Sequence, residues 1–487
     1  MKRSICVTVA ASTAAEARRI RESCGNRADY LELRADHLTP DEVSRGDWCG
    51  LPTDEVAWVF TWRSPAEGGV AGGRPPGILD RALEAGFTAV DVEAKTLARD
   101  PEGTAVPPGQ RWVSAHFDDE PADEADWESR WAGVAGHQAA LHKLVVSSGH
   151  GGVTRAVLKH VDILRAEGAS AFAVFAQGAA GHASRILGGL RGNAVTFAAP
   201  PDLPGAAPGQ PDLAVLVDAY RFRDQPSHPP VYGVLGYPAL HSLSPRMHNA
   251  ALARESLEGI YLPLECEDPA PVFEDVRNGV VRGLSVTAPH KMAAAAAAEE
   301  RSSQVELTGA ANTLWLEQGR LTAANTDVGA GRRLLADLGV APGSRVAVLG
   351  SGGAAAAVCA AVMELGATGT VFSRNRGAGE SLATRFDSEW GGSLEGLVPG
   401  DHHVVVNATP LGRENDLPVC FRNMAWPGAG ILDLVYAPQA TGFERLAREH
   451  DLPFRGGREF LVTQGSEQFR LWHGRTPDAA VLEEALA

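Results

Sequence analysis

Eight short apolar segments in the first part of the chain constrain the fold more than any other feature. They read ICVTV, DYLELR, VAWVFTW, TAVDVEA, RWVSAHF, LHKLVVS, AFAVFAQ and AVTFAA. Several are separated by helix-like segments such as TAAEARRIRE, GILDRALEAG and GVTRAVLKHVDILRAEG. Nearly continuous apolar strands that alternate with helices indicate a parallel sheet covered by helices. Eight such units in about 220 residues favour a (β/α)8 barrel over the alternative, an open doubly wound sheet.

A second α/β region follows a short polar segment. A closing helix, PDLAVLVDAYRF, is predicted to end the barrel at residue 222, and the proline-rich RDQPSHPP at 223–230 predicts a linker. Beyond it, SRVAVLGSGGAAAAVCAAVMELG predicts a strand, a glycine turn and a long helix of small residues. The predicted fold class is therefore α/β, with a barrel over residues 1–222 and a second region with a Rossmann-like part.

Composition excludes several classes of function. The formal net charge of −16 argues against general binding of nucleic acids or anionic membranes, which need a basic face, but not against a small anionic substrate. The 6 cysteines are scattered without a CxxC or a Cys/His cluster, which predicts reduced thiols, a cytoplasmic protein and no metal site. The start, MKRSICVTVAASTAA, is similar to a signal peptide. Its apolar run of about seven residues is short for one, so we expect a first strand instead.

Polar side chains stand near the ends of the predicted barrel strands, where barrel enzymes carry their catalytic groups. They are Thr8, Glu32, Arg34, Arg63, Glu93, His116 and Lys143. Each alone has an ordinary explanation, such as a solvated ion pair or a structural histidine. Together they place an amine, an imidazole, carboxylates and arginines at one end of the predicted barrel.

Lysine is rare in this chain, and nearly all of the positively charged side chains are arginines. It occurs only at positions 2, 95, 143, 159 and 291, and Lys143 stands in an apolar run. A desolvated amine near arginines can attack a ketone, which arginine cannot do. His116 can move a proton beside the resulting imine, and the arginines can hold an anionic substrate. Lys143 is therefore the candidate nucleophile.

Over residues 4–222 the sequence resembles the type I 3-dehydroquinate dehydratases, through LELRAD, TWRSPAEGG, SAHF, LHKLVVS, ASRILG and APGQ. The resemblance implies that Lys143 forms a Schiff base, that His116 is the general acid and base, and that Glu67 supports His116. It also implies substrate contacts by Thr8, Glu32, Arg34, Arg63, Arg185 and Gln210. Ala206 stands where the family usually has a serine. We therefore expect one hydroxyl contact with the substrate to be missing.

The glycine turn of the second region suggests a dinucleotide site, with a purely structural turn as the alternative. Gly350, Gly352 and Gly353 lie between a predicted strand and a predicted helix, where backbone can approach a pyrophosphate. The next strand ends at Arg374, with Arg376 nearby, where an NAD site would carry an acidic residue. Arginine suits a 2′-phosphate, so the sequence favours NADP; a surface basic cluster is the other explanation.

Residues 231–487 resemble shikimate dehydrogenases, through YGVLGYPALHSLSPRMHNAA, LSVTAPHKMAA, GAANTL, AANTDVGAG, VVVNATPLG, ILDLVYAP and LVTQGSEQF. The resemblance implies a shikimate-binding subdomain at 231–330, completed by 459–487, and an NADP-binding Rossmann-like subdomain at 331–458. Lys291 and Asp327 would be the catalytic pair. Substrate contacts would come from Ser242, Ser244, Thr287, Asn312 and Gln464. Cofactor contacts would come from Gly350, Gly352, Gly353, Ala354, Ser373, Arg374, Asn407, Thr409, Tyr436 and Gly457.

The spacing of the second set also makes chemical sense by itself. SVTAPHK predicts a strand end and a helix that starts at Pro289, which aims Thr287 and Lys291 at one cleft. Asp327 is predicted to lie just before the helix GAGRRLLADLG. A Lys–Asp pair can deliver a proton to an oxygen that a hydride is turning into an alkoxide, whereas a buried structural salt bridge is the alternative.

Two positions depart from the shikimate dehydrogenase pattern. Phe460 replaces a methionine near the nicotinamide, and Ala378 stands where a second basic residue is usual, a place that Arg376 could take. Retention of Ser242, Ser244 and Thr287 favours shikimate over the bulkier quinate.

The sequence as a whole predicts a fused enzyme. The first domain would dehydrate 3-dehydroquinate, and the second would reduce the product with NADPH to shikimate, in the domain order that plants have. The partners would be these small molecules, with the oligomeric state left open. The alternatives are a quinate dehydrogenase in the second half and a non-catalytic sensor, which would have lost Lys143, His116, Lys291 and Asp327.

Overall fold

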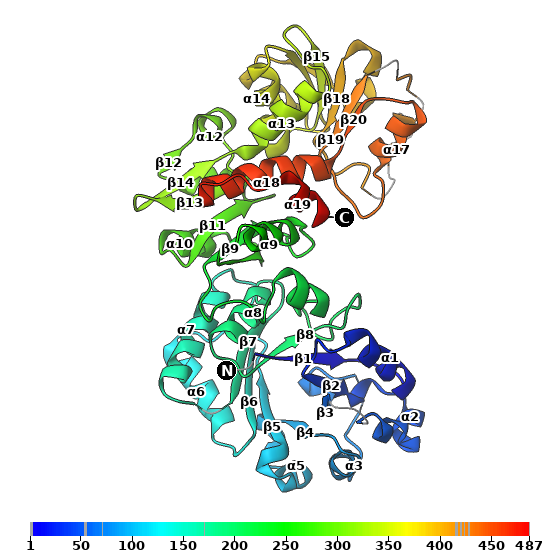
Figure 1. Cartoon of the computed structure of the whole chain (residues 1–487), viewed down its shortest axis with the longest axis vertical. Helices are drawn as coiled ribbons and strands as arrows, with labels where there is room; N and C mark the ends of the chain where they lie inside the picture. The colour runs from blue at the N-terminus through cyan, green and yellow to red at the C-terminus, as the bar shows by residue number, and fades with distance from the viewer. Residues whose placement is uncertain are drawn as a thin grey trace. The chain divides into compact units, whose positions relative to one another are not determined.

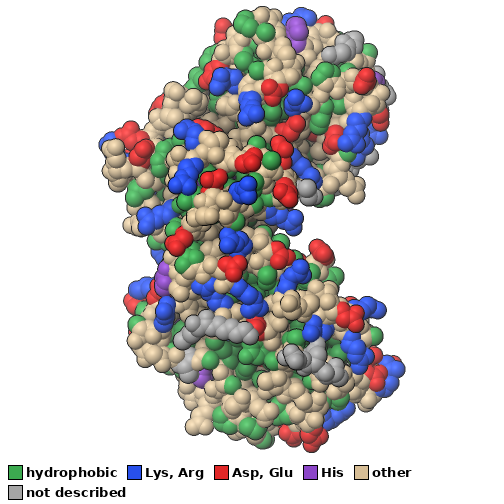
Figure 2. All heavy atoms as spheres, viewed as in Figure 1, with side chains coloured by type: hydrophobic (Ala, Val, Ile, Leu, Met, Phe, Trp, Pro, Cys, Tyr) green, Lys and Arg blue, Asp and Glu red, His purple; other side chains and the backbone are tan. Residues whose placement is uncertain are grey.

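Figure 1 shows the computed structural model of the chain, in which most helices alternate with strands. Acidic and basic side chains are interspersed on the face drawn in Figure 2. The structure describes residues 3–52, 56–70, 72–169, 171–413, 417–418, 421–422, 424–426 and 429–486. Lys2 and the cysteine at 420 lie outside the described residues. The chain divides into one compact unit of residues 1–229 and 258–271 and a second of residues 230–257 and 272–487. Within the described ranges, every helix is too short or too polar to cross a membrane.

All eight predicted strands of the first unit are present and form one sheet. They are β1 Ser4–Val9, β2 Tyr30–Arg34, β3 Ala57–Thr61, β4 Ala89–Glu93, β5 Arg111–His116, β6 Leu141–Ser147, β7 Phe172–Gln177 and β8 Val195–Ala198. The hydrogen-bonded order is β7-β6-β5-β4-β3-β2-β1-β8, and each neighbouring pair is parallel. The sheet curls into a nearly closed barrel (Figure 1), so the predicted barrel is confirmed and the open sheet is wrong.

Helices surround this barrel, and the longer ones bury apolar side chains. They are α1 Ala14–Cys24, α2 Pro40–Arg45, α3 Ile78–Glu84, α4 Ala94–Leu97, α5 Pro101–Ala105, α6 Glu124–Ala135, α7 Val153–Ala166 and α8 His182–Arg191. In α7, Val153, Val157, Val161 and Leu164 are buried, at the spacing of three and four residues that places side chains on one helix face. Burial of these side chains against the strands stabilises the barrel.

The predicted closing helix is shorter than its pattern suggested. The segment contains a π-helical turn at Val215–Ala219. The first residue of the predicted linker, Arg223, is anchored to the barrel: it donates to the carbonyl of Arg3 (3.0 Å) and pairs with Asp29 (2.8 Å). The end of the barrel segment is therefore fastened beside the first strand.

The barrel interior has an apolar layer beneath a polar one. Cys6, Val59, Ala89, Trp112 and Leu141 belong to one buried apolar cluster. Two residues further along the same five strands stand Thr8, Thr61, Asp91, Ser114 and Lys143. Alternate residues of a strand face the same side, so these polar side chains also point inward, one layer nearer the C-terminal ends of the strands. The site is thus set by strand periodicity.

A side chain closes the seam between β7 and β8. The backbone amide of Ala194, next to β8, donates to the carbonyl of Phe172 (2.7 Å). The Asn193 amide then acts as a strand partner for Val174: its Oδ1 accepts from the Val174 amide (3.0 Å), and its Nδ2 donates to the Val174 carbonyl (2.9 Å). A Cβ at Gly188 would come within 2.6 Å of Asn193 Nδ2, so the glycine makes room for this contact.

A mixed sheet begins just after the predicted linker. Its strands are β9 Val231–Gly236, β10 Ile260–Glu265, β11 Val281–Val286, β12 Glu300–Arg301, β13 Thr313–Glu317 and β14 Arg320–Ala324, in the order β10-β9-β11-β13-β14-β12. β9 and β11 are parallel, whereas β13 is antiparallel to both β11 and β14. The helices of this part are α9 Ser244–Arg254, α10 Ala270–Arg277, α11 Lys291–Ala297, α12 Ser303–Thr308, α18 Gly457–His473 and α19 Ala479–Glu484.

A fully parallel sheet forms the Rossmann-like part. Its strands are β15 Arg345–Leu349, β16 Thr368–Phe372, β17 Glu389–Gly392, β18 Val404–Asn407, β19 Gly430–Asp433 and β20 Phe454–Arg455, in the order β17-β16-β15-β18-β19-β20. The helices here include α13 Thr326–Asp337, α14 Gly353–Glu364, α15 Arg376–Arg385 and α17 Gly442–Glu449. Residues 355–362 of α14 are all buried, which explains why most residues of this helix are small. The predicted Rossmann-like fold is confirmed.

We predict that Asn193→Ala weakens the barrel seam. The change leaves the buried amide and carbonyl of Val174 without partners, at a cost of about 2–4 kcal/mol in the free energy of unfolding. Hydrogen–deuterium exchange should show faster exchange of the Val174 amide. Asn278→Ala, just after the end of α10, is the control and should leave exchange in β7 unchanged; equal protection of Val174 in both variants would contradict the role of Asn193.

Candidate active sites

One cavity in the first unit collects the predicted barrel residues. It measures about 610 Å³. Its lining includes Thr8, Glu32, Arg34, Arg63, Glu67, His116, Lys143, Arg185 and Gln210. The cavity is also lined by Ala206, at the position where a serine was expected.

Lys143 lies deeper than the sequence suggested. It is the third residue of β6, inside the barrel rather than at the strand end, and only 6% of it is exposed. Its Nζ lies 3.6 Å from Asp91 Oδ2, 4.0 Å from Glu32 Oε1 and 4.3 Å from the centroid of the Phe197 ring. The amine is therefore desolvated, faces two carboxylates and rests on an aromatic face.

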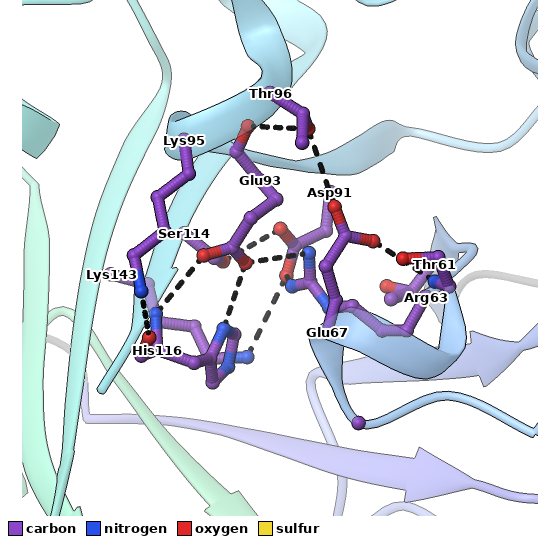
Figure 3. Close-up of polar contacts among 12 residues, drawn as sticks. Thr61, Arg63, Glu67, Asp91, Glu93, Lys95, Thr96, Ser114, His116 and Lys143 are labelled. Atoms are coloured by element: carbon purple, nitrogen blue, oxygen red, sulfur yellow. Dashed lines mark hydrogen bonds and ion pairs between the residues drawn. The ribbon is translucent and has the colours of Figure 1, made fainter. Parts of the chain in front are cut away.

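His116, the last residue of β5, is held by Glu93 (Figure 3). Its Nδ1 lies 2.9 Å from Glu93 Oε2, and its backbone amide donates to Glu93 Oε1 (3.1 Å). Burial lowers the pKa of His116 below its usual value, although the hydrogen bond with Glu93 acts in the opposite direction. Nδ1 is thus occupied, and Nε2 makes no hydrogen bond with any described residue, which leaves it available for proton transfer.

Glu67 does not make the expected contact with His116. It ends the short helix η3 Pro65–Glu67, where its carboxylate accepts from the Ser64 amide (2.9 Å) and from the Thr96 hydroxyl (3.3 Å). The capping interaction with Ser64 therefore occupies this carboxylate. The carboxylate that holds His116 in this structure is that of Glu93, on the neighbouring strand β4, where Glu93 stands opposite Ser114.

Arg63 and Arg34 are both engaged with protein carboxylates. Arg63 lies 2.9 Å from Asp91 and 3.2 Å from Glu93, and its side chain is buried. Burial opposes its charge, but these two carboxylates raise the pKa of the Arg63 guanidinium. Arg34 binds Asp36 in a bidentate manner, through Nε (3.0 Å) and Nη2 (2.9 Å). The substrate contacts expected of these arginines stay predictions.

Arg185 is a buried cation of this cavity that lacks a carboxylate partner among the described residues. It is 2% exposed, and its guanidinium lies 4.3 Å from the centroid of the Phe175 ring. Burial lowers the pKa of Arg185 to about 9. A buried guanidinium without a counter-ion favours an anionic ligand, and this cavity therefore suits a small carboxylate.

Hydrogen bonds fix the remaining predicted residues. Gln210 Nε2 donates to Thr8 Oγ1 (3.0 Å), and Thr8 in turn donates to Glu32 Oε2 (3.0 Å). Thr61 donates to the other oxygen of Glu32 (3.0 Å). Glu32 is held from two strands, so its carboxylate cannot turn away from Lys143.

A second cavity, of about 540 Å³, lies in the second unit. Its lining includes Ser242, Ser244, Thr287, Lys291, Asn312, Asp327, Ala354, Tyr436, Gly457, Phe460 and Gln464. The predicted substrate and catalytic residues of this half are thus brought together, with part of the predicted cofactor set. Gly350, Gly352, Gly353, Ser373, Arg374, Asn407 and Thr409 are not part of this lining.

Lys291 and Asp327 form a tight ion pair, with Nζ 2.5 Å from Oδ2. Asn312 Nδ2 donates to the other oxygen of Asp327 (2.8 Å). Two expectations about position were wrong: α11 begins at Lys291 rather than at Pro289, after a turn, and Asp327 lies inside the first turn of α13. Both side chains still reach one cavity, and the helix N-terminus favours the carboxylate of Asp327.

The glycine turn leaves space for a phosphate group. Gly350 has φ +118°, and a Cβ there would lie 2.9 Å from the Ala408 carbonyl, so only glycine fits. A Cβ at Gly352 would meet no atom within 4 Å, so the start of α14 is open. These features fit a dinucleotide pyrophosphate at a helix N-terminus.

The arginines beyond β16 differ from each other. Arg374 makes no ion pair with any described residue, which leaves it available to a 2′-phosphate. Arg376 is exposed and pairs with Glu380 (2.8 Å). Arg376 is therefore a poor substitute for the basic residue that the pattern lacks at Ala378.

Sequence reasoning missed Asp433, which ties together the wall of the second cavity. Its Oδ1 accepts from Asn407 Nδ2 (2.8 Å) and from the Val435 amide (3.1 Å), and its Oδ2 accepts from Thr441 (2.6 Å). Asn407 Oδ1 in turn accepts from the Thr409 hydroxyl (2.6 Å). Burial raises the pKa of Asp433 to about 6. The predicted residues Asn407 and Thr409 thus act in the loop structure, with Asp433 as their anchor.

Asp91 was also missed, although a signal for it exists. It stands inside the apolar strand TAVDVEA, between Ala89 and Glu93, and therefore shares the inward parity of both. A carboxylate in the inward register of a predicted barrel strand is the pattern that would have revealed it.

Family models match most of the chain. The model of type I 3-dehydroquinase matches residues 5–227. The model of the shikimate dehydrogenase substrate binding domain matches residues 234–314, and that of the shikimate 5′-dehydrogenase C-terminal domain matches residues 457–487.

Individual relatives match the second half. The shikimate dehydrogenase (NADP(+)) of Methanothermobacter thermautotrophicus is 35% identical over 271 residues, which are 53% of this chain and 95% of that protein. The protein of the same name from Citrifermentans bemidjiense is 36% identical over 277 residues, or 53% and 94%.

Two solved structures are also similar. Shikimate 5-dehydrogenase from Thermus thermophilus, in complex with NADP(H) and shikimate, is 34% identical with a TM-score of 0.48 and covers 53% of this chain and 98% of that chain. The dehydroquinate dehydratase and shikimate dehydrogenase from S. pombe is 22% identical with a TM-score of 0.45 and covers 100% and 99%.

We predict that Glu93, and not Glu67, controls the titration of His116. Since Glu93 raises the pKa of His116 against the effect of burial, Glu93→Gln should lower that pKa further. Glu67→Gln removes a cap instead and should leave the His116 titration unchanged. NMR titration of the histidine side chains in both variants measures this, and the opposite pattern would restore Glu67 to its expected role.

Proposed function

Because this chain joins a member of the type I 3-dehydroquinase family to a member of the shikimate dehydrogenase family, we propose that it catalyses two consecutive reactions. The first unit dehydrates 3-dehydroquinate to 3-dehydroshikimate, and the second reduces this product with NADPH to shikimate. The observation that carries the proposal is that each family match coincides with a cavity holding one of the chain's rare lysines, Lys143 or Lys291.

The first reaction begins with Lys143 as the nucleophile. Its neutral amine adds to the C3 ketone, and loss of water with uptake of one proton from solvent gives a protonated imine bonded to Nζ. The imine withdraws electrons, so the C2 proton becomes acidic, and His116 removes it through Nε2. His116 then returns the proton to the C1 hydroxyl, which leaves as water. Hydrolysis of the imine releases 3-dehydroshikimate and restores Lys143.

The surroundings of Lys143 support this role. Arg185, without a described carboxylate partner, suits the substrate carboxylate. Glu93 holds His116 Nδ1, and this fixes the ring so that Nε2 faces the site throughout both proton transfers. The low pKa of His116 means that the ring is neutral, and so able to accept a proton, near pH 7.

The second reaction uses the Lys291–Asp327 pair as the proton source. NADPH, when bound, supplies the hydride that reduces the ketone. Lys291 delivers a proton to the substrate oxygen, and Asp327 holds Lys291 at 2.5 Å and stabilises its charged form. Asn312 fixes the orientation of Asp327 from the other side. Ser242, Ser244, Thr287 and Gln464 would bind the carboxylate and hydroxyl groups of the substrate.

The residues of this chain fit the cofactor. Gly350, Gly352 and the start of α14 would hold the pyrophosphate, and Arg374 would hold the 2′-phosphate. Asp433 keeps Asn407 in place, and through it the loop at the nicotinamide side of the cleft. Tyr436 and Gly457 line the same cavity.

We also propose a cytoplasmic location and small molecules as the partners. The free thiols of Cys6, Cys24, Cys49 and Cys359 suit a reducing compartment. The net charge of −16 disfavours nucleic acids and anionic membrane surfaces as partners.

We predict that sodium borohydride with 3-dehydroquinate forms a stable adduct on Lys143. Peptide mass mapping should find it there and on none of the other lysines, because Lys143 is the buried lysine among those that the structure describes. Lys143→Arg should abolish the adduct and lower kcat for dehydration at least about 1,000-fold, as loss of a covalent nucleophile does. Lys159→Arg, at a largely exposed position, is the control. Wild-type protein without an adduct on Lys143 would refute the first reaction.

We predict that Lys291→Ala lowers NADPH-dependent reduction of 3-dehydroshikimate by about 10²- to 10⁴-fold, because the developing alkoxide loses its proton donor. Borohydride trapping in the first unit should stay unchanged. Met292→Ala, at the exposed neighbouring position, is the control. Full turnover by Lys291→Ala would exclude the assigned role, and faster oxidation of quinate than of shikimate by the wild type would change the assigned substrate.

A further inference from the structure

A chain of buried charges connects the two principal groups of the first cavity (Figure 3). Lys143 Nζ lies 3.6 Å from Asp91, and Asp91 lies 2.9 Å from Arg63. Arg63 lies 3.2 Å from Glu93, which lies 2.9 Å from His116. The sequence-based roles do not include Asp91, and they place Arg63 among the substrate contacts.

We propose that Asp91 is a positioning residue for the dehydration, the fixed counter-ion of Lys143 in both its ammonium and its protonated imine forms. The inference rests on the proposed function, since it concerns the same amine. It also gives Arg63, which lines the cavity, a task beyond the expected substrate contact: Arg63 holds Asp91 and Glu93 in place.

The geometry around Asp91 restricts its carboxylate to one orientation. Ser114 donates to Oδ1 (2.6 Å), so Oδ2 is the oxygen that faces both Arg63 and Lys143. The side chain of Asp91 is fully buried, so water cannot take over this task. Although burial opposes ionisation, Arg63 and Lys143 lower the pKa of Asp91, and the carboxylate therefore stays charged near pH 7.

The charged and titratable groups around Lys143 come from β1 to β5 and from α8. They are Cys6 on β1, Glu32 on β2, Arg63 after β3, Asp91 on β4, His116 on β5 and Arg185 on α8. Burial raises the pKa of Cys6 well above its usual value, so it is a neutral thiol. Glu32 and Asp91 are the carboxylates within 4.0 Å of Nζ.

Asp91 and Glu32 differ in what else they can do. Both oxygens of Glu32 accept from threonines, Thr8 and Thr61, and Glu32 lines the cavity, where a substrate hydroxyl can reach it. Asp91 does not belong to the cavity lining. Its charge therefore serves the protein groups alone, before and after substrate binds.

Competitive chemical labelling of the amine tests the proposal without substrate. Wild type, Asp91→Asn, Glu32→Gln and the control Asp29→Asn are labelled with trace acetic anhydride between pH 6 and 11, and the labelled Lys143 peptide is measured by mass spectrometry. Asp29 pairs with Arg223 at the opposite end of the barrel strands. Asp29→Asn therefore makes the same chemical change as Asp91→Asn, but at a different position in the barrel.

Loss of the counter-ion destabilises the ammonium form, so the labelling midpoint of Asp91→Asn should move about 1 pH unit or more lower than in the wild type. The kcat of dehydration should fall about tenfold or more, since one pH unit of lost charge stabilisation corresponds to tenfold. Asp29→Asn should change neither. A merely structural Asp91 would lower the melting temperature and leave the labelling midpoint in place, and that result would overturn the proposal.

Two further measurements keep the result decisive. If Asp91→Asn fails to fold, as judged by near-UV circular dichroism, Glu32→Gln decides: a midpoint shift of about 1 unit there would assign the counter-ion to Glu32 and refute our proposal, whereas a clearly smaller shift supports Asp91. Borohydride trapping of the wild type with 3-dehydroquinate runs in parallel. Absence of that adduct defeats the proposed function, whereas trapping with unshifted labelling defeats only this inference.

Discussion

The pairing of buried charges inside the barrel is the interaction on which the first site depends. An isolated carboxylate or ammonium in this interior would cost several kcal/mol. Arg63 stabilises Asp91 and Glu93, and Asp91 then stabilises Lys143. The removal of any one member leaves an uncompensated charge in a closed space. This mutual dependence holds the amine and the imidazole at fixed positions without a ligand.

The second unit applies the same rule with different groups. Asp327 is buried, but Lys291 and Asn312 satisfy its two oxygens. Asp433 is also buried, but among the described residues only amide and hydroxyl donors lie beside its carboxylate, and no cation does. Burial therefore raises the pKa of Asp433. One carboxylate is thus paired with a lysine, while the other anchors two loops.

The fold was largely predictable because the strands repeat with a period of two and the helices with a period near four. All eight barrel strands and the strand–glycine–helix unit of the second half follow from these periods. The boundaries were less certain: a turn precedes α11, so the helix starts at Lys291 rather than Pro289, and Asp327 belongs to the first turn of α13. These shifts depend on local turn geometry, which residue type alone does not determine.

The residues of the candidate sites were predictable from the sequence where their side chains line a cavity. They were harder to predict where a side chain contacts other side chains instead. The sequence indicated Lys143, His116, Lys291 and Asp327, whose chemistry is distinctive. It did not indicate that Glu93 rather than Glu67 holds His116, because the choice depends on which carboxylate the Ser64 cap occupies. Asp91 and Asp433 were missed because each is a single acidic residue in an apolar strand. Such a residue can be assigned to a site only when the strand is known to turn that position inward.

The scarcity of lysine acquires a physical meaning from these contacts. Lys143 and Lys291 are both beside carboxylates, yet the distances differ: 3.6 Å from Asp91 for the first, and 2.5 Å from Asp327 for the second. In the proposed second reaction, the tight contact holds Lys291 Nζ against Asp327. In the proposed first reaction, the longer contact keeps Asp91 beside Lys143 and leaves Nζ room to bond to a substrate carbon. The two proposed reactions therefore use the same type of side chain, with the nearest carboxylate oxygen about an ångström closer in one site than in the other.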